Sequence, residues 1–121
     1  MRKICRVDIE RSGEIFKGIE KYREEVVKRL NPAKVILFGS FARGYINEGS
    51  DVDLIVIADW KENFLDRIKL LLDINSFNLP LEPVGYTSKE FENAIEDKSP
   101  FILNLLEEGK IIYERQGEKR D

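Results

Sequence analysis

Histidine is absent from this 121-residue chain, and cysteine occurs once, as Cys5. One cysteine cannot form a disulfide within a single chain. Without His or a second Cys, the usual ligands of a zinc site are also missing. Catalysis by Ser-His-Asp or Cys-His groups is excluded for the same reason. If the protein is an enzyme, then carboxylates, Lys, Arg, Tyr or a metal ion must supply its chemistry.

Long apolar runs and a strong excess of one charge are lacking too. No run approaches the roughly 18 apolar residues of a membrane span, and no signal peptide is recognisable, so we expect a soluble cytoplasmic protein without a membrane partner. The net charge is −3 with both signs interspersed, so duplex nucleic acid is not an expected partner. The length suits one domain, predicted over residues 1–121 with an arm at 1–11, a core at about 12–113 and a frayed tail at 114–121.

Hydrophobic periodicity predicts a small mixed α/β domain, in which helices flank a β-sheet. Residues 1–10 alternate loosely and suggest a short strand or an arm, and a helical pattern runs from Ser12 to Asn31-Pro32. Buried strands are expected at 34–38 and 52–58. The other expected elements are a short helix at 40–46, a turn at 47–50, helices over 61–77, from 87 onward and over 101–108, and strands at 81–86 and 111–113.

Three local signals refine these elements. Pro83 favours the edge of the sheet for the strand at 81–86. Thr87-Ser88 begins a helix, with Glu90 or Glu92 helping to cap it. The inner side of the helix at 61–77 is expected to carry Phe64, Leu65, Ile68, Leu71, Leu72 and Phe77.

The loop that starts at Gly39 is a candidate anion site. Gly39 lets a ligand approach the backbone closely, and Ser40 offers a hydroxyl and an N–H at an expected helix N-terminus. Arg43 is a candidate for a charge-assisted contact. By itself, the loop is equally compatible with an ordinary strand-to-helix turn.

Two carboxylates follow this loop. Side chains i and i+2 of a strand share a face, so Asp51 and Asp53 project together and can grip Mg²⁺ beside phosphate groups. The alternative is a pair of solvated carboxylates at a strand start. An EF-hand is excluded because Ile55 and Val56 stand at its fifth and sixth positions, and a Walker A loop because Tyr45 follows Gly44. A glycosyltransferase D-x-D motif normally belongs to a much larger domain.

Residues 39–57, GSFARGYINEGSDVDLIVI, resemble the signature of the minimal nucleotidyltransferases, in the DNA polymerase beta-like superfamily. That signature reads G-S-x-A-R-G, a short spacer and S-D-x-D-[LI]. The resemblance covers about residues 12–113. It implies a mixed sheet flanked by helices, and it implies transfer of a nucleoside monophosphate, usually AMP from ATP, to a hydroxyl acceptor.

The resemblance also implies residue roles. Gly39 and Ser40 would hold the triphosphate, and Asp51 and Asp53 would ligate Mg²⁺. Glu82 occupies the place of the family's third carboxylate, where it would bind metal or act as the acceptor's base. It departs from the more usual Asp, and the alternative is a solvent-facing residue on an edge strand.

The acceptor is expected to come from a partner, since the chain has no room for a second substrate domain. In the family, this partner is often a HEPN-domain toxin, which is adenylylated on a tyrosine or simply covered. Phe101, Ile102 and Leu106 are candidates for such an interface, with burial in the core as the alternative. Three functions stay open: an adenylylating antitoxin, a binding module that masks a toxin, and transfer to RNA or a small molecule. Oligomers are compatible with each.

Overall fold

The computed structural model describes residues 3–39, 51–77 and 79–116, with side chains described from Gly13 onward. The helix expected at 40–46 and the turn at 47–50 lie outside these residues. The described elements, in chain order, are α1 (Lys3–Leu30), β1 (Lys34–Phe38), β2 (Val52–Ile57), α3 (Phe64–Ile74), β3 (Leu81–Tyr86), α4 (Ser88–Glu96), α5 (Pro100–Glu108) and β4 (Lys110–Glu114). No helix in this part of the chain is both long and apolar enough to cross a membrane.

The strands form a mixed four-stranded sheet in the order β3-β2-β1-β4. β1 pairs antiparallel with both β2 and β4, whereas β2 and β3 are parallel. β3 therefore lies at an edge, as Pro83 predicted, because proline cannot donate a ladder hydrogen bond. The mixed α/β fold expected from the sequence is confirmed.

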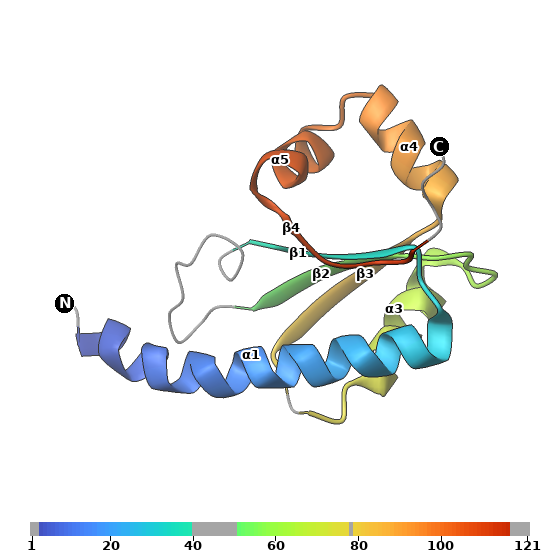
Figure 1. Ribbon diagram of the computed structural model, residues 1–121. Coiled ribbons are helices and arrows are strands. Elements are labelled where there is room, and N and C mark those ends of the chain that lie inside the picture. Colours follow the sequence, from blue (N-terminus) through green and yellow to red (C-terminus); the bar gives the residue numbers. More distant parts are fainter. Residues whose placement is uncertain (1–2, 40–50, 78, 117–121) are drawn as a thin grey trace.

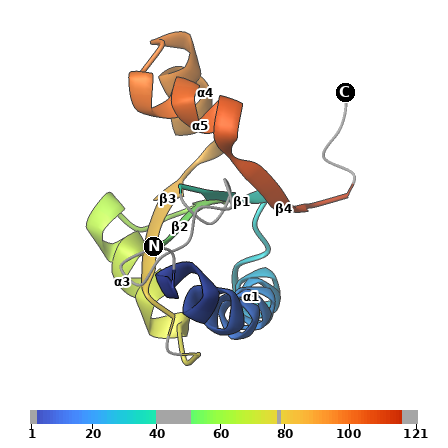
Figure 2. The ribbon, with the colours of Figure 1, turned by 90° about the vertical axis from the view of Figure 1, so that its left-hand side faces the viewer.

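The sheet separates two apolar cores. Helices α1 and α3 cover one face, and α4 and α5 cover the other (Figures 1 and 2). Because side chains alternate along a strand, each central strand supplies both cores. Val52, Leu54 and Val56 of β2 pack toward α1 and α3, while Ile55 and Ile57 pack toward α4 and α5. Burial on both faces explains why β2 is almost continuously apolar.

The first helix begins earlier than the sequence indicated. α1 starts at Lys3, so the expectation of a strand within residues 1–10 is wrong. Three alternating apolar residues are too few to distinguish a strand from a helix. No proline interrupts residues 3–30, and once a helix exists, each added residue gains a hydrogen bond without a new nucleation cost. Further along, the buried Tyr22 hydroxyl donates to the Leu71 carbonyl at 2.7 Å and joins α1 to α3.

The buried face of α3 is also rotated from the expected one. Leu71 is buried as expected, but Phe64, Leu65 and Leu72 are exposed. The other buried residues of α3 are Arg67 and Ile74. The helix begins after Asn63, whose side chain accepts a hydrogen bond from the Asp66 N–H at 2.9 Å. A prediction that assigns only apolar residues to the inner face of a helix cannot find a buried arginine there.

Arg67 is buried because four acceptors surround its guanidinium group. It donates to the carbonyls of Glu62 at 2.7 Å and Gly85 at 3.1 Å, and to both carboxylate oxygens of Glu90 at 2.7 and 3.3 Å. Glu90 also accepts from the Thr87 N–H and completes the capping box of α4. The hydrogen bonds from Arg67 lower the pKa of Glu90 below its usual range. Arg67 thus connects α3, β3 and α4 across the sheet edge.

We expect Arg67→Ala to lower the free energy of unfolding by about 2–3 kcal/mol, because the buried Gly85 carbonyl and the partly buried Glu62 carbonyl lose their donor. Urea denaturation measures the change. Arg29→Ala is the matched control, since Arg29 pairs with Glu25 at 3.1 Å but is 56% exposed. Its loss should stay below about 0.5 kcal/mol. Equal losses in the two variants would contradict the role assigned to Arg67.

Candidate active site

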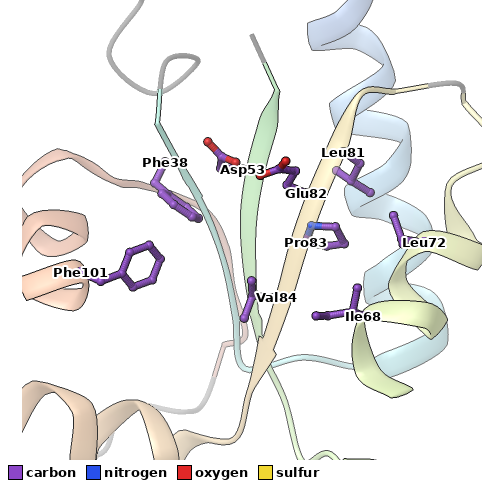
Figure 3. Close-up of a pocket in the computed structure, with 9 residues that line it drawn as sticks. All are labelled: Phe38, Asp53, Ile68, Leu72, Leu81, Glu82, Pro83, Val84 and Phe101. Carbon is purple, nitrogen blue, oxygen red and sulfur yellow. The ribbon is translucent and has the colours of Figure 1, made fainter. Parts of the chain in front are cut away.

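Asp53 and Glu82 face each other across neighbouring strands. In the parallel register of β2 and β3, Asp53 is the direct partner of Glu82. Asp53 shares the α4/α5 side of the sheet with Ile55, and Glu82 shares it with Val84. Figure 3 shows the two carboxylates side by side. Asp53 is half-buried and Glu82 is exposed, so this acidic pair lies at the border between the core and solvent.

The acidic pair is electrostatically unfavourable when fully ionised. Burial, which is the largest cause, the charges of Glu82 and Asp51 and a hydrogen bond with Glu82 together raise the pKa of Asp53 to about 6. Because the folded pKa lies above the unfolded one, this group adds stability below about pH 4. That stability is lost as the pH rises through 6. Near neutral pH, the fold therefore holds repelling charges together.

Gly39 allows the backbone to pass close to Asp53. Phe38, directly before it, is the register partner of Asp53 on β1. Gly39 has a φ of 76°, which is a left-handed conformation that side chains rarely adopt. A Cβ atom at this position would also overlap the Asp53 Oδ2 atom. Two independent constraints therefore require glycine at the point where β1 ends beside the acidic pair.

The structure brings together four of the six predicted site residues. Gly39 and Asp53 are in contact distance, Glu82 is beside Asp53, and the exposed Asp51 immediately precedes β2. Asp51 is near enough for its charge to act on Asp53. The other two predicted residues, Ser40 and Arg43, lie outside the described residues, and their contacts remain predictions.

The donor set of this site suits a hard divalent cation. Within the described ranges, no Lys or Arg side chain forms an ion pair with Asp53 or Glu82. In the same ranges, no three Asp, Glu, His or Cys side chains are close enough together to hold a metal ion. The carboxylates of Asp53, of Glu82 beside it and of the nearby Asp51 are the hard oxygen donors that Mg²⁺ prefers.

A pocket of about 580 Å³ opens beside the acidic pair (Figure 3). Apart from Asp53 and Glu82, its lining is apolar and comprises Phe38, Ile68, Leu72, Leu81, Pro83, Val84 and Phe101. Phe38 and Phe101 meet edge to face, with ring centroids 5.5 Å apart. From the sequence, Phe101 was a candidate for a partner interface, with burial in the core as the alternative. Local sequence patterns do not predict that α5 lies over the β1 side of the site.

Comparison with known proteins identifies the family. A family model for the nucleotidyltransferase domain matches residues 19–114. The chain belongs to the nucleotidyltransferase domain family. This membership confirms the resemblance carried by residues 39–57, and it assigns the domain to a family of transferases. Nucleotidyltransferases of this family generally use a divalent metal, which agrees with the oxygen donors at Asp53 and Glu82.

Two curated relatives come from Methanocaldococcus jannaschii. One, named "Putative protein adenylyltransferase MJ1305", is 37% identical over 87 residues, which cover 67% of this chain and 58% of that protein. The chain thus spans less than two thirds of this relative's length. The other, named "Putative protein adenylyltransferase MJ0604", is 33% identical over 82 residues, covering 66% of this chain and 77% of that protein.

The fold is also similar to a solved nucleotidyltransferase structure. The crystal structure of a "putative nucleotidyltransferase" from Sulfolobus solfataricus superposes with a TM-score of 0.65 at 19% sequence identity. The match covers 91% of this chain and 89% of that one. At this identity the similarity concerns the fold alone. It agrees with the mixed sheet and the two helical layers described above.

We expect Gly39→Ala to lower the free energy of unfolding by about 1–2 kcal/mol, because the new methyl group meets both a left-handed backbone and the Asp53 carboxylate. Gly13→Ala provides the control, because Gly13 lies within α1 and a Cβ there meets nothing within 4 Å. That change should stabilise the protein by about 0.5–1 kcal/mol. Thermal unfolding of both variants measures the difference, and a neutral Gly39→Ala would refute the close approach.

Proposed function

We propose that this protein is a Mg²⁺-dependent nucleotidyltransferase that transfers AMP from ATP to a hydroxyl group of a protein partner. The observation that carries the proposal is the Asp53–Glu82 pair beside Gly39, within a domain of the nucleotidyltransferase family. The names of the two M. jannaschii relatives support a protein as the acceptor. ATP is the expected donor, and the cytoplasm is the expected location.

The proposed reaction is an in-line displacement at the α-phosphorus of ATP. The acceptor oxygen forms a bond to this phosphorus while the bond to pyrophosphate breaks. Gly39 and Ser40 hold the triphosphate through backbone N–H groups. Asp51 and Asp53 would hold Mg²⁺, which would supply positive charge to offset that of the phosphates and of the leaving pyrophosphate. Glu82 orients the acceptor hydroxyl and takes its proton.

The order of the strands supports an acceptor-side role for Glu82. β3 is an edge strand, and Glu82 is exposed while its partner Asp53 is half-buried. A macromolecular hydroxyl can therefore reach Glu82 without entering the core.

The proposed partner is a HEPN-type toxin, modified on a tyrosine, with this protein as its antitoxin. Exposed apolar side chains on α5 and β4 support a protein-binding surface, and they include Leu103, Leu106 and Ile111. Ile102 was a candidate for the same interface, with burial in the core as the alternative, and it is 1% exposed and belongs to the α4/α5 core. The helical turn directs Ile102 inward and leaves Phe101 and Leu106 accessible.

A second candidate function is masking of the toxin without transfer. The exposure of Glu82 and its identity as Glu instead of the family's more usual Asp favour this alternative. In that case the acidic pair would bind a nucleotide and metal, or neither, while α5 and β4 cover the partner. The two functions differ in whether neutralisation of the partner depends on Asp51 and Asp53.

We expect Asp51→Asn and Asp53→Asn each to reduce AMP transfer at least about 100-fold, since each removes a charge that holds Mg²⁺. Transfer of label from α-³²P-ATP to the protein encoded beside this one measures the activity. Asp59→Asn is the matched control, because Asp59 is an exposed carboxylate just beyond the opposite end of β2. It should retain full activity. Absence of transfer by the unaltered protein, with the partner still neutralised by the Asp51/Asp53 double variant, would establish masking instead.

A further inference from the structure

An exposed aromatic ring on α5 stands beside the acidic pair without being required by the core. Ile102 and Leu105 of this helix are buried at 1% and 4% exposure, whereas Phe101 is 47% exposed. Phe101 nevertheless lines the same pocket as Asp53 and Glu82 (Figure 3). Its edge-to-face contact with Phe38 fixes the ring and leaves much of its surface open. An accessible, oriented ring at a polar site is suited to contact with a ligand ring.

Phe38 and Phe101, the aromatic pair, lie on the β1 side of the site. Phe38, Asp53 and Glu82 are register partners in a row across β1, β2 and β3. Asp53 is thus in the middle, with the aromatic pair on the β1 side and Glu82 on the β3 side. This inference rests on the proposed function, which assigns Glu82 to the acceptor and the β1 end, at Gly39, to the triphosphate. The aromatic pair is therefore on the donor side.

The proposed chemistry also separates the nucleoside from the acceptor. In an in-line displacement, the acceptor and the pyrophosphate approach and leave on opposite sides of the α-phosphorus. The ribose and base must therefore extend away from the line that joins the acceptor, the α-phosphorus and the pyrophosphate. On the α4/α5 side of the sheet, Phe38, Val84 and Phe101 offer an apolar surface in such a direction. The α3 side of the pocket is lined separately, by Ile68, Leu72 and Leu81.

We propose that Phe101, supported by Phe38, is the platform on which the nucleobase of the donor nucleotide stacks. Stacking of a base on an aromatic side chain needs no hydrogen-bond readout, which agrees with the lack of other polar side chains in the described lining. Removal of such a ring typically weakens binding roughly 5- to 150-fold. Phe101 is thus a binding residue for the base, distinct from the carboxylates that act at the phosphates.

Calorimetric titration of the full chain with α,β-methylene-ATP and Mg²⁺ tests the proposal, because this analogue cannot transfer AMP. Phe101→Ala should weaken its binding about tenfold, while ribose 5-triphosphate, which has no base, should bind the variant and the unaltered protein equally. Phe101→Leu keeps an apolar side chain in place and should show the same selective loss. Leu65→Ala is the control, because Leu65 is 70% exposed on α3 and does not line the pocket.

Three results would overturn the assignment of Phe101 as the platform for the nucleobase. One is unchanged affinity for α,β-methylene-ATP in both Phe101 variants. Another is an equal loss for the analogue and for ribose 5-triphosphate, which would indicate a general distortion of the site. The third is unchanged analogue affinity with a raised KM for the acceptor, which would assign the ring to the partner. Failure of the proposed function differs from all three, since the unaltered protein would bind the analogue but transfer no AMP from ATP.

Discussion

The opposition of two carboxylates across neighbouring parallel strands is the constraint around which this domain is arranged. Asp53 and Glu82 are register partners, and burial and mutual repulsion raise the pKa of Asp53 to about 6. Such a pair weakens the fold unless a cation joins it. Its retention at the edge of an otherwise apolar sheet is the kind of local cost that accompanies a functional site.

The surrounding structure holds this unfavourable pair in place. β2 is covered on both faces, so the backbone that carries Asp53 cannot move away from β3 without opening two cores. Tyr22 joins α1 to α3, and Arg67 joins α3 to β3 and α4. Gly39 then lets β1 end against the Asp53 carboxylate. The stability of the layers thus offsets the repulsion at the site.

Local signals in the sequence predicted most helices and strands. They could not predict which residues far apart in the sequence would contact each other. The proline at position 83 indicated an edge strand, and Thr87 with Glu90 indicated a helix start, because both effects act within a few residues. The pairing of Asp53 with Glu82 depends on the register of two strands far apart in the sequence, and only the family resemblance suggested it. The burial of Arg67 could not be predicted, because its acceptors come from Glu62, Gly85 and Glu90, two of which are distant in the sequence. The start of α1 was predicted too late in the chain, because the few apolar residues near Cys5 do not distinguish a strand from a helix.

The most direct test of this account is the titration of the Asp53 carboxyl carbon by NMR, with and without Mg²⁺. The account predicts a midpoint near pH 6 in the absence of metal, a lower midpoint in Glu82→Gln, and a midpoint below about 4 in saturating Mg²⁺. A midpoint near 4 that responds neither to Mg²⁺ nor to Glu82→Gln would contradict it. In that case Asp53 and Glu82 would be independent surface carboxylates, and the site would have to lie elsewhere.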